Sequence, residues 1–518
     1  MSDPGKSGLD PVKLELVWTR LISAVDEAAK AIVRTSFSTL SNEANDFACV
    51  LTDAEARSLA QNTGSIPSFI GTLPNTVRAI REAIPEAEMR PGDIYVTNNP
   101  WIGTGHLNDV CLVRPIFHGG RIVAYGATTS HVPDIGGRLR STEARELFEE
   151  GFHIPPMLLL REGRADATLI KLLRTNIRTP DQTEGDIWAQ ASAVTLIGDR
   201  VVQTLTDHGL EDLGAVATEI FDRSEAAMAE RLAALPEGSW EAAIETDGMD
   251  QPFHLQVRVT LKDGRLLADF AGSSPQQPRS VNCPFTYTRA MSWFVLKAML
   301  LPDLPSNEGI FRPIRISVPE GCILNPREPA PVGGRAATGH YVPVLMFRAL
   351  AEALPDKVRA APGSPLWMMS LAGRDQSGQP YAGTLFFNGG TGAGATQDGC
   401  DSISWPSNIS ATPVEVAERT APVMIHRKVQ RAGSGGTGTH RGGLGHETEI
   451  ECETDGMAAV FVTERIKFPA PGLFGGGAGA LGEVLIDGKP VNTRTQQVLN
   501  KGTRVIIRTP GGGGYGAG

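Results

Sequence analysis

The sequence predicts an α+β fold, in which an N-terminal mixed α/β region is followed by a Gly-rich, β-dominated C-terminal part. Apolar residues recur every three or four positions in several stretches of the first half, which is typical of amphipathic helices. Short β-branched and aromatic runs bounded by turn residues dominate the last third, which is typical of strands. The chain of 518 residues has 58 glycines and 36 prolines, and so many turn formers argue against an all-helical protein.

The N-terminal region is expected to begin with a helix over residues 10–35. Its apolar side chains form one stripe, Asp10 can cap the first turn and Pro11 fits that turn. The pattern then predicts a strand–turn–strand unit, a helix, a strand, a β-hairpin and a stretch of long helix, over residues 46–61, 74–84, 92–100, 109–130 and 180–235.

The character of the sequence changes at about Pro236. A strand pair, a short buried helix, a strand and a helix are predicted over residues 254–274, 291–300, 312–324 and 342–354. From about residue 365 the chain is Gly-rich with β-like runs, which predicts a β-sandwich or a barrel-like layer. We therefore expect three domains: an α/β metal-site domain ending in long helices (1–235), an α+β middle domain (236–364) and a Gly-rich β domain (365–518).

Composition excludes several classes of protein. The net charge is −10, whereas nucleic-acid and anionic-membrane binding need clustered Lys and Arg. The N-terminus lacks the basic and apolar regions of a secretory signal. The sequence contains no run of about 18 apolar residues, so no membrane-spanning helix is predicted. The six cysteines are far apart and form no Cys-x-x-Cys motif, which favours a reduced, cytoplasmic protein over a disulfide framework.

The predicted hairpin at residues 109–130 brings candidate metal ligands together. His106 and Asp109 lie at the start of its first strand, and His131 follows its second. Because antiparallel strands of similar length bring these ends together, two imidazoles and a carboxylate should converge. Such a set leaves an open position, as in catalytic metal sites. The competing interpretation is that these histidines only cap turns.

Further carboxylates could join this site. Asp134 lies three residues beyond the second histidine, and could ligate the metal or orient a histidine. Glu43 and Asp46 precede a predicted strand and could supply another ligand.

Two Gly-rich stretches match dinucleotide-binding fingerprints only in form. Neither GTGAGA (residues 390–395) nor GSGGTG (433–438) is followed by a helix that could hold a pyrophosphate. A phosphate loop and a nucleophile elbow are also missing. We therefore expect no nucleotide site in this chain. The final residues 509–518 are either a flexible tail or a segment docked where only glycine fits.

The chain as a whole resembles the hydantoinase B/oxoprolinase family. The resemblance covers nearly the whole chain and consists of many blocks in order, among them NEANDFACVLTDAE, IPSFIGTLPNTV, GDIYVTNNPWIGTGHLNDVCLVRPIF, SHVPDIGG, PAPVGGR, FNGGTGAGATQDG, AGSGGTGTHRGGLG and TPGGGGYG. It implies one subunit of an ATP-dependent assembly. The group includes 5-oxoprolinases, N-methylhydantoinases, caprolactamase, and acetone and acetophenone carboxylases.

The family's metal site can be carried over to matching positions of this chain. The resemblance implies that Glu43, His106, Asp109 and His131 hold a divalent metal, with zinc favoured and manganese or iron as alternatives. Many members that hydrolyse cyclic amides have a histidine directly before the Ile-Pro of the second block, where this chain has Ser65. The resemblance therefore specifies the metal more closely than the substrate.

The implied activity is ATP-dependent hydrolysis of a cyclic amide. A hydantoinase A-type partner would bind ATP, form an α2β2 hetero-oligomer with this chain and phosphorylate the substrate, and a metal-activated water would then attack it. Asp46 and Asp134 are candidate bases or ligand-orienting groups. Arg335 and Arg441 could hold a phosphate, although a structural ion pair fits either one equally.

Two other functions remain open on the sequence. The same metal could serve a subunit of an ATP-dependent ketone carboxylase, and the ligands do not separate that activity from amide hydrolysis. The chain could also be a non-catalytic scaffold for the ATP-binding subunit.

Overall fold

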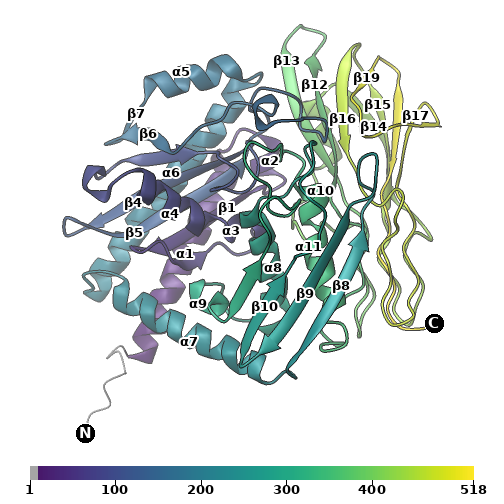
Figure 1. The fold of residues 1–518 in the computed structure, drawn as a ribbon. Coiled ribbons are helices and arrows are strands. Elements are labelled where there is room, and N and C mark those ends of the chain that lie inside the picture. Colours follow the sequence, from purple (N-terminus) through teal and green to yellow (C-terminus); the bar gives the residue numbers. More distant parts are fainter. Residues whose placement is uncertain (1–9) are drawn as a thin grey trace.

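The computed structural model describes residues 10–518, so the N-terminal residues over which no secretory signal is expected lie mostly outside it. Helices and several largely antiparallel sheets alternate along the chain (Figure 1), and the predicted α+β class is confirmed. Over the described range, no helix combines the length and the apolar character needed to cross a membrane. All six cysteines are free. The division into three domains stays a prediction.

The N-terminal region is built on a seven-stranded antiparallel sheet of order β2-β1-β5-β4-β3-β6-β7. Its strands are β1 (Phe47–Asp53), β2 (Ser58–Gln61), β3 (Ile94–Thr97), β4 (Asp109–His118), β5 (Arg121–His131), β6 (Met157–Arg161) and β7 (Arg164–Ala165). The predicted strand pair and hairpin are confirmed as β1–β2 and β4–β5. The last two strands had no counterpart in the sequence analysis.

Helices cover both faces of this sheet. On one face lie α1 (Pro11–Thr35) and α6 (Pro180–His208), and on the other lie α3 (Pro67–Ile70) and α4 (Leu73–Ala83). Side chains of β1 alternate accordingly, because Cys49 packs with α1 and Val50 packs with α4. The helix predicted over 10–35 is confirmed, and Asp10 caps it by accepting a hydrogen bond from the Val12 N–H at 3.1 Å.

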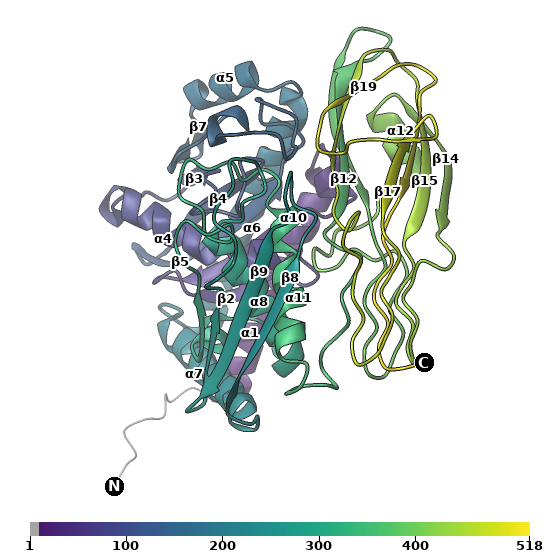
Figure 2. The same ribbon diagram turned by 45° about the vertical axis from the view of Figure 1, so that its right-hand side comes forward.

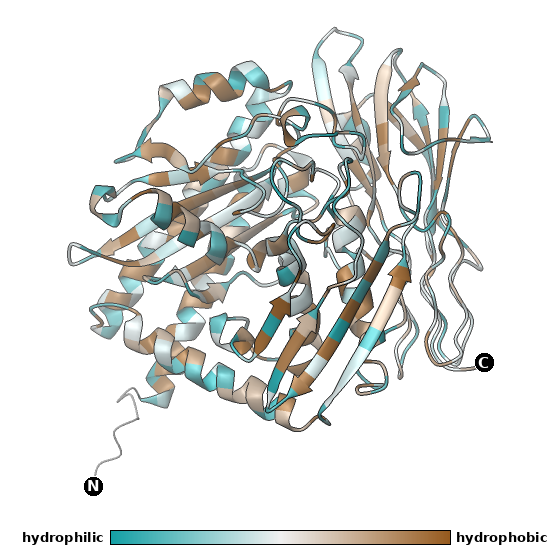
Figure 3. Cartoon of the chain, in the orientation of Figure 1, coloured by the Kyte–Doolittle hydropathy of each residue, from teal (hydrophilic) through white to brown (hydrophobic). Residues whose placement is uncertain are grey.

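A four-stranded sheet of order β11-β10-β9-β8 forms the middle region. Its strands are β8 (Gly238–Glu245), β9 (His254–Lys262), β10 (Arg265–Asp269) and β11 (Ile314–Ser317), and α7 (Gly214–Ala233) precedes it. Figure 3 shows the alternation of apolar and polar residues along β9 as brown and teal bands. The apolar face packs on α8 (Phe285–Leu300) and α11 (Tyr341–Ala349). Strand β8, outside the predicted elements, pairs with β9 along its whole length.

Two sheets packed face to face form the C-terminal region, seen at the right of Figure 2. One sheet contains β13, β12, β16 and β19, and the other β14, β15, β20, β17 and β18. Their bounds are β12 (Trp367–Arg374), β13 (Pro380–Phe387), β14 (Val423–Gln430), β15 (His446–Cys452), β16 (Met457–Val462), β17 (Glu483–Ile486), β18 (Lys489–Pro490), β19 (Gln497–Leu499) and β20 (Arg504–Arg508). Of the two predicted alternatives, the structure is the β-sandwich.

The remaining helical elements are short connections outside these sheets, except for one longer helix, α5, at the N-terminal sheet. They are α2 (Thr39–Asn42), η1 (Glu86–Glu88), η2 (Leu147–Glu149), α5 (Ala167–Asn176), α9 (Glu308–Phe311), α10 (Ala336–Gly339) and α12 (Val414–Thr420).

The glycine-rich stretches pack together as extended backbone below the sandwich. The Gly512 N–H donates to the Gly443 carbonyl at 2.9 Å, and the Gly512 carbonyl accepts from the Gly436 N–H at 2.8 Å. A Cβ atom on Gly512 would lie only 2.0 Å from the Thr391 carbonyl oxygen, so no larger residue fits there. The C-terminal glycine run is therefore a docked segment. The same packing explains why the two fingerprint-like stretches lead into no helix.

A buried polar cluster joins the middle region to the sandwich. The Glu464 carboxylate accepts hydrogen bonds from Arg494 Nη2 at 2.8 Å, the Asp247 N–H at 3.1 Å and the Tyr341 hydroxyl at 3.2 Å. Burial raises the pKa of Glu464 to about 7, although Arg494 opposes the shift. Asp247 in turn accepts from three successive N–H groups that begin at Ile466.

Glu464→Gln is expected to weaken the pH dependence of stability. Because the folded pKa lies above the ordinary value of 4.5, the folded state binds the extra proton, and stability is lost as pH rises from 4.5 through about 7. The full shift corresponds to about 3 kcal/mol. Thermal unfolding at pH 5 and pH 8 should therefore show a smaller difference in the variant. Glu320→Gln, at an exposed position, is the control and should keep the wild-type difference between the two pH values. A wild-type difference in Glu464→Gln as well would contradict the prediction.

Candidate metal centre

The hairpin β4–β5 brings the predicted ligands together. Asp109 and His131 are paired across the two strands at the open end of the hairpin. His106 sits one turn earlier, and its carbonyl accepts a hydrogen bond from the Asp109 N–H at 3.2 Å. The predicted convergence of the three side chains is confirmed, and their role in holding a metal stays a prediction. Candidate ligand atoms of His106, Asp109 and His131 all lie within 4.8 Å of one another, and all three residues are buried.

The Asp109 carboxylate lies between the two imidazoles. Its Oδ2 is 3.1 Å from His106 Nδ1, and its Oδ1 is 3.2 Å from His131 Nδ1. The two rings meet edge to face with centroids 4.8 Å apart. Apart from this contact of Nδ1 with the Asp109 carboxylate, the buried His106 ring makes no hydrogen bond within the described residues, and its Nε2 has no partner there. A buried imidazole nitrogen without a partner is costly unless an additional group binds it.

Arg335 comes from the middle region and binds the same carboxylate. Its Nη2 donates to Asp109 Oδ2 at 2.6 Å and its Nε donates to the Thr104 carbonyl at 2.7 Å, while the Thr104 hydroxyl also donates to Oδ2. Gly105 leaves room for it: a Cβ atom there would lie 2.5 Å from Arg335 Cδ, and its φ is +104°. The glycine directly before His106 is therefore required by both its conformation and this close approach.

A second guanidinium lies on the other side of the group. Arg140 Nη1 is 3.2 Å from His131 Nε2, and Arg140 Nε donates to the Gly333 carbonyl at 3.1 Å. Glu150 anchors that loop, because its carboxylate accepts from the N–H groups of Val332 at 3.1 Å and Gly333 at 2.8 Å. One buried carboxylate thus positions the loop that carries Arg335 and contacts Arg140.

A small cavity of about 30 Å³ lies beside these groups. Helix α3, helix α8, the α10 turn and the sandwich all contribute to its wall, so it lies where the N-terminal region, the middle region and the sandwich meet (Figures 1 and 2). The polar residues of the lining are Asp46, Ser68, His106, His131, Arg140, Tyr287, Arg335, His340 and Ser407. Asp46 is therefore the nearby carboxylate that faces the cavity together with the two histidines.

Burial and charge set the protonation states of the group. Burial lowers the pKa of His131 to about 4, with Arg140 adding to the effect, and burial lowers that of His106 well below its ordinary range. Burial opposes ionisation of Asp109, but Arg335 together with His131 and the Thr104 hydroxyl outweighs it and holds the pKa of that carboxyl low. The group therefore offers two neutral imidazoles and one carboxylate, which are the forms that bind metals.

Asp46 differs from Asp109 in its charge state. Burial, followed by the neighbouring Asp109 carboxylate, raises the pKa of Asp46 to about 7. Its carbonyl accepts a hydrogen bond from the His131 N–H at 2.9 Å, which fixes its position relative to the group. Two neighbouring carboxyl groups with separated pKa values are suited to different roles.

The donor set fits a divalent cation. Two nitrogens and one carboxylate oxygen suit zinc, manganese or iron, and a metal would give the His106 ring the partner that its Nε2 lacks among the described residues. Arg335 competes for one oxygen of Asp109 but leaves Oδ1 without an arginine contact. Asp46 and Asp109 together supply negative charge against the two guanidinium groups.

The structure does not bring the other candidate residues to this group. Glu43 is half-buried at the C-terminal end of α2 and does not line the cavity. Asp134 binds Arg178, whose N–H and Nη1 both donate to its carboxylate at 2.5 Å. Arg441 lies among the glycine-rich segments and pairs with Asp401 at 2.9 Å. Their predicted roles remain predictions.

Sequence reasoning missed five polar residues of the cavity wall, namely Ser68, Arg140, Tyr287, His340 and Ser407. Arg140 stands nine residues beyond His131, Tyr287 begins α8, and His340 follows α10. His340 Nδ1 accepts from the Leu366 N–H at 3.2 Å, so its Nε2 carries the proton and faces the Tyr287 hydroxyl at 3.0 Å. The only signal in the sequence is the closeness of His340 to Arg335 along the chain.

The chain is similar over almost its whole length to known proteins. The family model described as hydantoinase B/oxoprolinase matches residues 10–518. A putative D-/L-hydantoinase subunit of Pseudomonas sp. strain NS671 is 28% identical, over 98% of this chain and 90% of that protein. The crystal structure of ATP-dependent caprolactamase from Pseudomonas jessenii aligns with a TM-score of 0.89 and 27% identity, covering 98% of this chain and 92% of the other.

A nucleotide-free structure of acetone carboxylase has the same fold. It aligns with a TM-score of 0.89 over 98% of this chain and 76% of the other, but at 19% identity. At that identity the likeness concerns the fold alone.

Proposed function

Because the chain belongs to the hydantoinase B/oxoprolinase family, we propose that it is the metal-dependent catalytic subunit of an ATP-dependent cyclic amide hydrolase. The observation that carries the proposal is the buried group of His106, Asp109 and His131, in which His106 has no other partner among the described residues. Family names support the reaction type, since the relatives include a hydantoinase and a caprolactamase. We propose a hydantoinase A-type ATP-binding partner, in an α2β2 complex.

In this proposal three side chains hold the divalent metal and Asp46 serves beside them. His106, Asp109 and His131 would bind the ion, with zinc favoured and manganese or iron as alternatives. When bound, such a metal supplies Lewis-acid chemistry and a water of lowered pKa. We propose Asp46 in place of Glu43 as the further carboxylate, because Asp46 faces the cavity.

The residues of the chain would then move and stabilise charge. Asp46 has a pKa of about 7, so near neutral pH it can accept a proton from the attacking water. The Tyr287 hydroxyl oxygen accepts a hydrogen bond from His340 Nε2. Its own O–H is therefore free to donate a hydrogen bond to a developing oxyanion. Arg140 and Arg335 would stabilise the negative charge of a substrate phosphorylated by the partner.

The test is turnover of the complex of this chain with its ATP-binding partner. Hydantoin, 5-oxoproline and ε-caprolactam would each be supplied with ATP, and ring opening and ADP would be measured together. We expect at least one ring to open only with ATP. Prolonged chelation should reduce the rate to about a hundredth, and zinc or manganese should restore it.

Two outcomes would contradict the proposal. Consumption of a ketone that depends on ATP and bicarbonate, without ring opening of any amide, would identify a carboxylase. Full ring-opening activity in a complex that elemental analysis shows to be free of metal would exclude the metal-dependent mechanism.

A further inference from the structure

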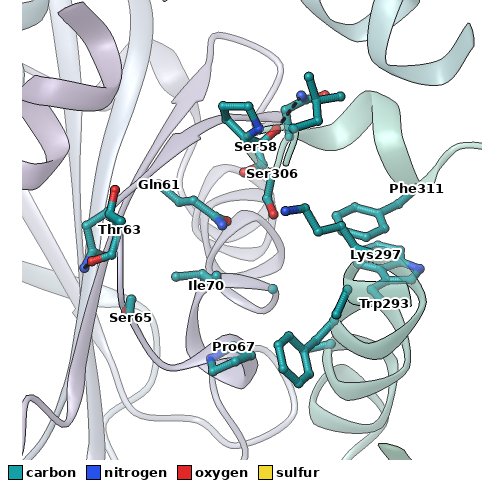
Figure 4. A pocket seen from close by; sticks show the side chains of 18 of the residues that line it. Ser58, Gln61, Thr63, Ser65, Pro67, Ile70, Trp293, Lys297, Ser306 and Phe311 are labelled. Atoms are coloured by element: carbon teal, nitrogen blue, oxygen red, sulfur yellow. Dashed lines mark hydrogen bonds between the residues drawn. The ribbon is translucent and has the colours of Figure 1, made fainter. Parts of the chain in front are cut away.

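A second and larger cavity lies on the outer side of helix α3. This outer pocket has a volume of about 470 Å³ and is lined by residues of three segments, 58–74, 290–298 and 302–311, together with Ile22 (Figure 4). Exposed residues form its rim, among them Thr63, Ala298 and Pro302, so it opens to solvent. Its volume lies within the range of small-molecule sites, about 300–1,000 Å³. None of the metal-group residues lines it.

The outer pocket and the metal cavity share one wall. Ser65, Pro67 and Ile70 face the outer pocket, whereas Ile66, Ser68 and Phe69 face the metal cavity. Successive residues of one short helix therefore separate two cavities.

Helix α8 forms the opposite side of both cavities. Tyr287 in its first turn lines the metal cavity, and Ala290, Trp293 and Lys297 in the following turns line the outer pocket. The two helices touch at Gly71, where a Cβ atom would lie 2.7 Å from Ala290 Cβ. The two cavities thus follow one another along the seam between α3 and α8.

The small volume of the metal cavity gives the outer pocket a role in substrate binding. About 30 Å³ holds no more than about two water molecules, which is too little for a cyclic amide. A cyclic amide would therefore need the lining residues to move before it could reach the metal group. The outer pocket is large enough for it and lies directly behind that wall.

The lining of the outer pocket specifies a chemical class of ligand. Trp293 stacks on Phe311 with ring centroids 4.6 Å apart, and Phe294 and Ile70 add to an apolar wall. Across the pocket, Figure 4 shows the Gln61 amide and the Lys297 amine pointing toward each other. The Lys297 amine donates to the Pro302 carbonyl at 2.7 Å, which leaves further donor positions. Apolar rings with two convergent donors fit an apolar molecule that carries a carbonyl or carboxylate.

We propose that the outer pocket binds a small molecule with an apolar body and one hydrogen-bond-accepting carbonyl or carboxylate, held by Gln61 and Lys297. In the active complex it receives the substrate before the substrate passes α3 to the metal cavity; this second statement rests on the proposed function. A bound protein segment is the competing occupant.

Binding is tested with 8-anilinonaphthalene-1-sulfonate, which combines an apolar body with an anionic acceptor. Wild-type chain is expected to bind the probe with a fluorescence increase that saturates at one site. Ala298→Trp and Ser306→Trp place a large side chain on two different segments of the pocket lining and should each weaken binding at least tenfold. Lys297→Met should weaken it less, since the apolar wall remains. Ala226→Trp, at an exposed position of α7, is the matched control and should bind within twofold of wild type.

Turnover of the complex tests the receiving role. Both filling variants should raise KM at least tenfold with kcat within about twofold of wild type, whereas Ala226→Trp should change neither. The cyclic amide that the complex opens should also displace the probe from the wild-type chain.

Three results would overturn the inference. Wild-type probe affinity in both filling variants would exclude the binding site, and wild-type KM in both would exclude the receiving role. Loss of assembly with the ATP-binding partner in both variants, with no probe bound by the wild-type chain, would identify a protein-docking surface. Failure of the proposed hydrolase is distinguishable, because probe binding needs neither ATP nor metal and should persist in Asp109→Asn.

Discussion

Asp109→Asn is expected to reduce ring-opening turnover by about 10³-fold or more, which corresponds to about 4 kcal/mol of transition-state stabilisation. Asparagine keeps the shape of the side chain and one oxygen for Arg335, but it removes the charge that lies between the two imidazoles. Metal content should fall together with turnover. The measurements are kcat, elemental analysis of the purified complex and the thermal unfolding midpoint.

Asp53→Asn is the matched control for this substitution. Asp53 is also a buried aspartate of the same sheet paired with an arginine, Arg57, at 2.6 Å, but it is not part of the metal group. Its variant should assemble and turn over within about threefold of wild type. An Asp109→Asn complex that assembles normally and keeps full turnover would exclude a catalytic metal here and would support the scaffold interpretation.

Arg335→Leu is expected to destabilise the metal-free chain by about 3 kcal/mol, because it leaves a buried carboxylate without its arginine. Arg335 is only 3% exposed, and its contacts with Asp109 and Thr104 join the α10 turn to the hairpin. Loading with zinc should recover part of the loss, since a cation then again neutralises Asp109. Arg335→Lys should lose less than Arg335→Leu, because it keeps the charge but not both contacts.

The corresponding comparison is Arg57→Leu, which also leaves a buried carboxylate, Asp53, without its arginine. The loss should be nearer to about 1 kcal/mol, because the Arg57 side chain is 30% exposed and Asp53 keeps the N–H groups of Glu55 and Arg57 as donors. The double variant Arg335→Leu with Asp109→Leu removes both charges and should be more stable than Arg335→Leu alone. Denaturant unfolding of the metal-free chains measures all of these. If the double variant and Arg335→Leu were equally stable, the unpaired Asp109 carboxylate would not be the cause of the lost stability.

Much of the fold could be predicted because its signals are local. The stripe of α1, the β4–β5 hairpin and the long helices before residue 235 each follow from the spacing of apolar residues over one or two elements. Strands such as β8 and β12 were missed because their context is tertiary. The outward face of β8 is exposed, and β12 is buried along most of its length between β13 and β16, so neither pattern is distinctive by itself.

The residues of the candidate site could likewise be predicted only where local structure places them. His106, Asp109 and His131 could be found because they flank one hairpin, and a hairpin brings its ends together whatever the rest of the molecule does. The sequence offered both Glu43 and Asp46 as a further carboxylate, and the resemblance selected Glu43. The structure leaves Glu43 outside the cavity, whereas Asp46 faces it. Three residues apart on one loop, these two carboxylates could not be distinguished before the direction of each side chain was known.

By itself, the sequence determined that the protein is α+β, that two imidazoles and a carboxylate converge at the hairpin end, and which family the chain resembles. Only the tertiary structure decided what surrounds that group: Arg335 on the carboxylate, Arg140 on His131, the Tyr287–His340 pair and an outer pocket behind α3. The physical reason is the range of the interactions. Hydrogen bonds and turns act between neighbours in the chain, whereas burial, pKa shifts and cavities depend on segments that meet only when the three regions pack together.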